Sequence, residues 1–309
     1  MWRYCKWVLL STMLTACYGQ ENKPAKESGF SFVFLTDIHL QNKRGACDAF
    51  QLVIDTVNKL DVDFVMTGGD LVFDVMRGNL GHSDSLFKLY MTYEEKFSIP
   101  VYHAIGNHEL FGIYPESNVD SLHSDYKYGM FERYFGDTYY SFNHKHWHFI
   151  VLNSLMVKDK VYYGMIDKKQ KSWLQQDIAL VDSETPIAVI THIPMITMFY
   201  HLNSGDNAPN GMIGVRNYRE ILALFEKHNL KLVLQGHLHW LEDINVRNKT
   251  RFITGGAVAG RPSWRGAKYN EEGFLKNTVD EQNDISWQYI DYGWNAETQS
   301  RVQPQEQLN

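Results

Sequence analysis

Five short segments of the chain carry Asp, Asn or His residues, and each of them follows an apolar run. Ligand sites in open α/β sheets lie beyond the carboxyl ends of the strands, so the polar side chains of these segments are expected to converge. One such segment alone would be an ordinary turn or strand end, but five of them favour a common site. The segments are Asp37-Ile38-His39, Gly69-Asp70, Gly106-Asn107-His108-Glu109, Thr191-His192 and Gly236-His237-Leu238-His239.

The residue types of these segments predict a centre that binds two divalent metal ions. Imidazole nitrogens, carboxylates and a carboxamide oxygen suit manganese, iron or zinc, and no thiolate is among them. A single catalytic zinc takes three or four protein ligands, and the seven candidate groups exceed that number. The candidate metal ligands are Asp37, His39, Asp70, Asn107, His192, His237 and His239.

The spacing of the paired ligands predicts their local geometry. In Asp37-X-His39 and His237-X-His239 the two ligands alternate by two, which would place both side chains on one side of an extended segment. Neighbouring glycines such as Gly69 would let the backbone turn sharply beside the ions.

The charge of such a centre suits an anionic phosphate ester. Two divalent cations outweigh the carboxylates of Asp37 and Asp70 together with a bound hydroxide, so the centre stays positive. Metals about 3.5–4 Å apart would clamp the attacking and leaving oxygens and bring the pKa of bound water toward about 7. We therefore expect hydrolysis of a phosphate ester by a two-metal mechanism, with a bridging hydroxide as the nucleophile.

In this order, the five segments resemble the motifs of the calcineurin-like metallophosphoesterases, and the resemblance covers roughly residues 30–258. The Asp-X-His opening and the Gly-Asn-His-Glu block look most like the cyclic-nucleotide phosphodiesterase branch of that family. The resemblance implies that Asp70 bridges the metals and that His108 protonates the leaving oxygen or stabilises its charge. The ligands that it implies are Asp37, His39, Asp70 and His239 for one metal, and Asp70, Asn107, His192 and His237 for the other.

Positions beside the candidate ligands refine this resemblance. Phe73 stands where the purple acid phosphatase branch has a tyrosine, and His39 stands where that branch favours glycine, so a di-iron centre with a bound tyrosinate is not expected. A positioning role is the alternative for His108. We expect Glu109 to hydrogen-bond a neighbouring imidazole rather than to bind metal.

Other histidines fit simpler roles. His144, His146 and His148 alternate and could form a further metal site, but the same stretch is typical of a polar hairpin turn, and we predict the hairpin. His103 lies in an apolar run and is expected to be packed or hydrogen-bonded there.

A glycine-rich segment at 255–266 lacks the Gly-Lys-Ser/Thr ending of a nucleotide P-loop. Arg261 or Arg265 could bind a substrate phosphate bidentately, and Trp264 could stack on a base or sugar. The alternative is a surface loop with a packed tryptophan.

Apolar runs and helical spacing alternate along the chain from residue 30, which predicts an α/β fold. The later strands follow one another with little helix between them, so part of the sheet is expected to be antiparallel. We predict a layered sandwich with a central mixed β-sheet, in two sheets flanked by helices, and the metal site at the strand C-terminal ends. Expected strands are 30–35, 63–66, 100–105, 139–142, 148–152, 186–190, 230–234, 241–246, 251–254 and 286–291, and expected helices are 46–60, 83–97, 167–180 and 218–228.

The N-terminus is typical of an exported protein. Arg3 and Lys6 precede an apolar run that is about half of the roughly 20 residues that a membrane span needs. Leu14-Thr15-Ala16-Cys17 resembles a bacterial lipoprotein signal, and the alternative is an ordinary secretory signal. We predict export and lipid anchoring to a cell-envelope membrane, on its periplasmic or surface face. The expected organisation is a signal peptide at 1–16, a flexible tether at 17–29 with the lipid on Cys17, a catalytic domain at 30–294 and a polar tail at 295–309.

The net charge limits the kinds of partner that the protein is expected to bind. The formal charge of −6 argues against a nucleic-acid polymer, which leaves a small phosphorylated substrate and, through the lipid, the membrane. A cyclic nucleotide is the substrate nearest to the resemblance, although export separates the protein from cytosolic pools. A phosphomonoester, a nucleotide or a phosphorylated glycan is an alternative. A catalytically silent metal- or phosphate-binding lipoprotein is the alternative of another class.

Overall fold

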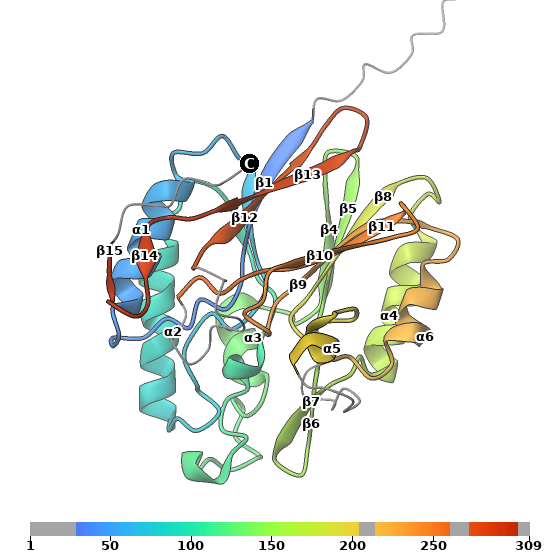
Figure 1. Cartoon of the computed structure of the whole chain (residues 1–309). Helices are drawn as coiled ribbons and strands as arrows, with labels where there is room; N and C mark the ends of the chain where they lie inside the picture. The colour runs from blue at the N-terminus through green and yellow to red at the C-terminus, as the bar shows by residue number, and fades with distance from the viewer. Residues whose placement is uncertain (1–28, 204–213, 260–271, 302–309) are drawn as a thin grey trace, which may run out of the picture.

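A computed structural model describes residues 29–203, 214–259 and 272–301 of the chain (Figure 1). Several predicted features lie outside these described residues. They are the signal peptide, nearly all of the tether, the lipid site Cys17 and the candidate substrate contacts Arg261, Trp264 and Arg265.

Two mixed β-sheets form the centre of the fold, as the alternating pattern predicts. The first sheet has the order β13 (Ile285–Ile290), β12 (Phe274–Val279), β1 (Phe30–Leu35), β2 (Phe64–Thr67) and β3 (Val101–Tyr102). The second has the order β10 (Glu242–Val246), β11 (Thr250–Thr254), β9 (Asn229–Gln235), β8 (Pro186–Thr191), β5 (Trp147–Leu152) and β4 (Tyr140–His144). In the first sheet, β1 pairs in parallel with β2 and antiparallel with β12; in the second, β8 pairs in parallel with both β5 and β9.

Helices flank the two sheets on opposite sides (Figure 1). The buried residues of the first helix recur three and four positions apart, as expected of a helix that packs one apolar face on a sheet. Asn79 and Asp167 cap two of the helices, because their side chains accept backbone N–H groups of the first turn. The helices are α1 (Ala46–Val57), α2 (Leu80–Glu94) and α3 (Gly129–Phe135) on one side, and α4 (Lys168–Ala179) and α6 (Tyr218–Leu224) on the other.

The central strand β1 is buried on both faces from Phe32 on, so its sequence is apolar except for Ser31 and does not alternate with polar residues. Phe32 and Phe34 belong to the cluster between the two sheets, whereas Val33 and Leu35 belong to the cluster that includes the first helices. The ring of Phe149 in β5 lies edge-on to Phe32, with 5.6 Å between the centroids. Aromatic packing therefore joins the sheets face to face.

Several short elements were not predicted. The strand β12 was missed, as was the hairpin of β6 (Leu155–Lys158) and β7 (Val161–Gly164). Part of the expected polar tail, 295–301, instead contributes to a small hairpin of β14 (Trp294–Asn295) and β15 (Ser300–Arg301). The remaining elements are α5 (Phe199–Asn203) and the 3-10 turns η1 (Asn107–Glu109) and η2 (Pro115–Ser117).

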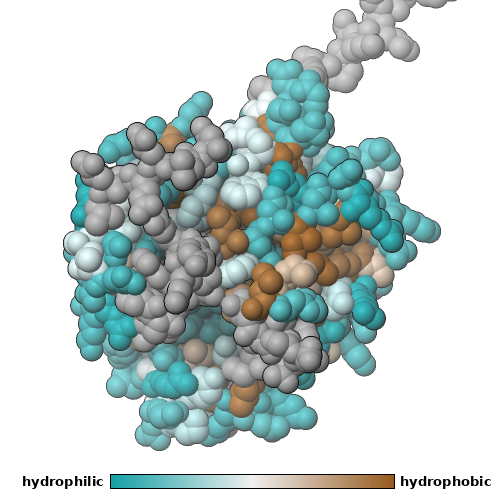
Figure 2. Space-filling model, viewed as in Figure 1, coloured by the Kyte–Doolittle hydropathy of each residue, from teal (hydrophilic) through white to brown (hydrophobic). Residues whose placement is uncertain are grey.

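One face of the described part is mostly polar (Figure 2). Figure 2 shows hydrophilic side chains over most of the visible described surface, with hydrophobic ones gathered near the strands of the second sheet. Among the described helices, none combines the length and the apolar composition that crossing a membrane requires.

Candidate metal centre

The candidate ligands all follow strands, and five strands from both sheets bring them to one place. Asp37 and His39 follow β1, and Asp70 follows β2. From the second sheet, His192 follows β8. The other candidate ligands are Asn107, which opens η1 after β3, and His237 and His239, which follow β9.

Asp37, His39 and His239 form one group of metal-ligating atoms, all within 4.8 Å of one another. Nε2 of His39 lies 3.0 Å from Nε2 of His239. The same atom of His239 lies 3.2 Å from Oδ1 of Asp37. Two imidazoles and a carboxylate thus point at a common centre.

Asp70, His192 and His237 form a second group of the same kind. Nε2 of His192 lies 3.0 Å from Oδ1 of Asn107 and 3.3 Å from Oδ2 of Asp70. That Asp70 oxygen is also 4.0 Å from Nε2 of His39 in the first group. Asp70 therefore lies between the two groups, where a bridging ligand would be needed.

The donor atoms face one another in an arrangement that suits bound cations better than direct contact between the side chains. Nδ1 of His192 donates to the carbonyl oxygen of Gly68 at 2.7 Å, so in the neutral ring Nε2 carries a lone pair aimed at the oxygens of Asp70 and Asn107. Oδ1 of Asp37 is buried and, among the described residues, has Nε2 of His239 at 3.2 Å but no assigned hydrogen bond. Lone pairs that face one another in a dry site repel unless a proton or a cation lies between them.

The ionisation of these groups also favours a bound cation. Burial opposes charge on Asp37, but His239 and His192 outweigh it and lower the pKa of Asp37 to about 2. Burial also opposes charge on His192, but Asp70 and Asp37 outweigh it and raise the pKa of His192 to about 9. The buried carboxylates therefore stay ionised and attract positive charge, which a divalent cation supplies as well as a proton does.

The prediction that the paired ligands lie on extended segments is wrong. Asp37, His39, His237 and His239 have φ of 56°, 50°, 72° and 50°, in the left-handed region. With this backbone, Asp37 and His39 belong to one group, whereas His237 and His239 belong to different groups. Such backbone is strained by about 1–3 kcal/mol per residue and persists where the surrounding structure fixes it; here Asp37 Oδ2 accepts the N–H of His237 at 3.0 Å.

The glycines beside the ligands allow close approach rather than flexibility. A Cβ added to Gly106 would lie 2.1 Å from the backbone nitrogen of Asp70, and one added to Gly236 would lie 2.1 Å from Oγ1 of Thr36. Both distances are far inside van der Waals contact, so any larger residue would push the strand ends apart.

The expectation that Glu109 hydrogen-bonds a neighbouring imidazole is wrong. Its carboxylate is fully buried and accepts backbone N–H groups of Asp70, Val72 and Gly106 at 2.8–3.0 Å, and the described residues give it no imidazole partner. Burial and the charge of Asp70 raise its pKa to about 8, against the backbone bonds that favour the carboxylate. Glu109 therefore shapes the loop that presents Asp70, because that loop leaves N–H groups which strand pairing does not satisfy.

His108 forms a third such group with His39 and Asp70, so it lies beside both of the groups described above. Its Nδ1 accepts the N–H of Asp74 at 2.9 Å, so in the neutral ring the proton is on Nε2. That Nε2 is 3.9 Å from Oδ2 of Asp70. Phe73, which replaces the tyrosine of the purple acid phosphatases, packs against the ring with 5.6 Å between the centroids.

The other histidines have structural roles. His144 ends β4, and β4 and β5 form the predicted hairpin. His148 bonds Asn143 and Asp177, and His103 bonds Glu94. Within the described ranges, no group with metal-ligand geometry contains any of these histidines.

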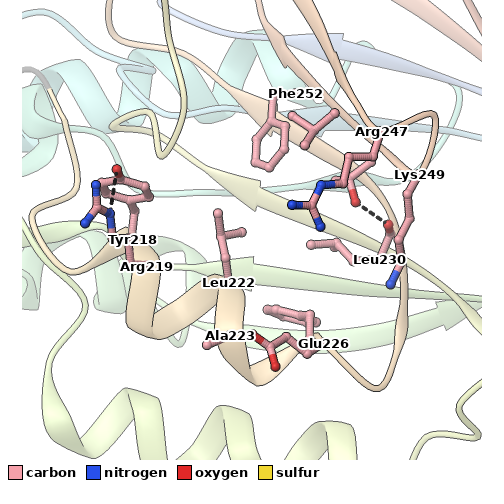
Figure 3. A pocket seen from close by; sticks show the side chains of 12 residues that line it. Tyr218, Arg219, Leu222, Ala223, Glu226, Leu230, Arg247, Lys249 and Phe252 are labelled. Carbon is pink, nitrogen blue, oxygen red and sulfur yellow. Dashed lines mark hydrogen bonds between the residues drawn. The ribbon is translucent and has the colours of Figure 1, made fainter.

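Sequence patterns gave no signal for Tyr162, which lies edge-on to His237 with 6.1 Å between ring centroids. Its hairpin was not predicted, and a tyrosine in a short apolar strand is normally a core residue. A pocket of about 450 Å³ lies elsewhere (Figure 3), between α6 and the β9–β11 strands, and is lined by residues such as Leu222, Arg247 and Phe252. That pocket is separate from the candidate metal centre.

Comparisons with known proteins agree with this geometry. A model of the calcineurin-like phosphoesterase family matches residues 30–241. The probable cyclic nucleotide phosphodiesterase of Xenorhabdus bovienii is 21% identical over 265 residues, which cover 82% of this chain and 96% of that protein.

Two solved structures have a similar fold. A dimetal phosphatase from Danio rerio has a TM-score of 0.60 at 16% identity, covering 85% of this chain and 96% of that one. GAP50, the anchor in the inner membrane complex of Plasmodium, has a TM-score of 0.57 at 17% identity, covering 86% and 85%.

The family match spans well over half of the chain and includes every segment from which the candidate ligands come. Members of this family typically bind two divalent metals, and the two adjacent groups of nitrogen and oxygen donors are compatible with that number. The chain therefore belongs to the calcineurin-like phosphoesterase family, as a metal-dependent hydrolase of phosphate esters.

Proposed function

We propose that this hydrolase cleaves a phosphodiester of the cyclic-nucleotide type with two divalent cations, of which manganese, iron and zinc suit the donors best. The observation that carries the proposal is the position of Asp70 between two groups of buried imidazole and carboxylate donors. The name of the Xenorhabdus relative supports the diester class.

Each cation would have four protein ligands, with Asp70 common to both. When bound, the cations would neutralise phosphate charge and lower the pKa of water held between them. The protein's own part is to keep the donors apart from solvent and in fixed directions, as the hydrogen bond from His192 to Gly68 does. The proposed ligands are Asp37, His39, Asp70 and His239 for one cation, and Asp70, Asn107, His192 and His237 for the other.

His108 would act on the leaving oxygen. The bond from the Asp74 N–H to Nδ1 directs the protonated Nε2 toward the two groups. A donor in that direction can protonate a departing alkoxide or stabilise its charge.

Replacing Asp70 or His237 with Ala should abolish both turnover of bis(p-nitrophenyl) phosphate and bound metal, because each variant removes a ligand. Turnover and metal content by mass spectrometry measure the outcome. His82→Ala is the matched control, since His82 is exposed on α2. Full turnover in both ligand variants would refute the metal assignment.

The substrate class requires a comparison of esters. We expect kcat/KM for a cyclic nucleotide to exceed that for phosphomonoesters, nucleotides and phosphorylated glycans by at least about tenfold. Steady-state kinetics of the manganese-loaded protein give the ratios. A higher kcat/KM for any of the other classes would reassign the substrate, and no turnover of any ester would favour a silent binding protein.

His108→Ala should lower kcat for an alkyl phosphate diester by about 10²–10⁴-fold. The loss should be smaller for a p-nitrophenyl ester, because nitrophenolate leaves without a proton. Metal content should stay that of the wild type. An equal loss for both esters would mean that His108 positions the substrate instead.

We also propose that the protein is anchored to a cell-envelope membrane by a lipid on Cys17, on the basis of the Leu14-Thr15-Ala16-Cys17 segment. Cys17→Ser, expressed in a bacterium, should move the protein from the membrane fraction to a soluble fraction, because the acyl chains supply the membrane affinity. Fractionation with immunodetection tests this. A variant that stays with the membrane would rule out lipid attachment at Cys17.

A further inference from the structure

The β6–β7 hairpin brings Tyr162 to the edge of the candidate metal centre. Its ring lies edge-on to His237, with an interplanar angle of 86°. Tyr162 is only 8% exposed. Burial and the charge of Asp70 raise the pKa of its phenol well above the ordinary value, against the charge of Arg77.

The hydroxyl of Tyr162 forms no hydrogen bond with another described residue, although a buried tyrosine hydroxyl usually finds a partner. The hydroxyl oxygen is not fully buried. It therefore belongs to the small part of Tyr162 that remains accessible. A phenol at neutral pH is protonated, so this accessible group can donate a hydrogen bond.

The neighbouring cation is already engaged. A guanidinium nitrogen of Arg77 lies 3.0 Å from Oδ2 of Asp74, and the guanidinium lies 4.2 Å from the ring centroid of Tyr114. Arg77 thus already interacts with two partners, whereas the Tyr162 hydroxyl can still donate a hydrogen bond. A phosphate ester brings oxygens that accept such a proton.

We infer that the Tyr162 hydroxyl donates a hydrogen bond to a nonbridging phosphoryl oxygen of the bound substrate and so positions it. The inference rests on the proposed function, since it assumes that a phosphate group binds beside His237. Tyr162 would be a substrate-binding residue that adds to the charge supplied by the centre. Its ring would keep its packing against His237 in either case.

The test is Tyr162→Phe, which removes the hydroxyl and keeps the ring. We expect kcat/KM for bis(p-nitrophenyl) phosphate to fall about 10- to 100-fold, the range for a lost hydrogen bond to a charged group. The dissociation constant of inorganic phosphate, from calorimetry on the manganese-loaded protein, should rise about 10-fold or more. Metal content and the thermal unfolding midpoint should stay unchanged.

Tyr163→Phe is the matched control. Tyr163 is the next residue of β7, half-buried, with the Arg216 guanidinium 4.4 Å from its ring centroid, and this variant should behave as the wild type. Wild-type kinetics and phosphate affinity in Tyr162→Phe would overturn the inference, as would a loss that accompanies lost metal or a lower midpoint. An inactive wild type would count against the proposed function alone if phosphate binding still weakened in Tyr162→Phe.

Discussion

The buried carboxylate of Asp70 is the group around which the candidate metal centre is arranged. Asp70 is 1% exposed; one of its oxygens accepts the N–H of His108, and the other lies 3.3 Å from Nε2 of His192. An ionised carboxylate is costly to bury unless opposite charge is close. The fold meets this constraint with imidazoles from strands of both sheets, whose lone pairs are also suited to cations.

Packing between the sheets determines whether those side chains can meet. Phe32 and Phe64 stack within the first sheet with 5.0 Å between centroids, and Phe149 of the second sheet lies edge-on to both. Because protein interiors are close-packed, this aromatic layer resists sliding of one sheet past the other. The position of His192 relative to Asp70 thus depends on contacts between residues far from the centre.

The backbone at the strand ends is as important as the side chains. Asp70 itself has a φ of 54°, in the left-handed region, and its loop is stabilised by the buried Glu109 carboxylate. A polar group that accepts several N–H groups can hold a strained loop without binding a ligand itself. Glu109 therefore holds the strained loop of Asp70 in place through backbone hydrogen bonds.

The sequence by itself determined the chemical kind of this protein: the type of each donor atom, the strands that precede the donors, the two-sheet α/β fold and the hairpin around His144. These follow from single residues and from local periodicity. Only the tertiary structure decided that the paired ligands have left-handed backbone, that Glu109 accepts backbone N–H groups, and that an unpredicted hairpin brings Tyr162 beside the centre. The physical reason is that dihedral angles and contacts at strand ends depend on pairings between distant segments, which local spacing does not encode.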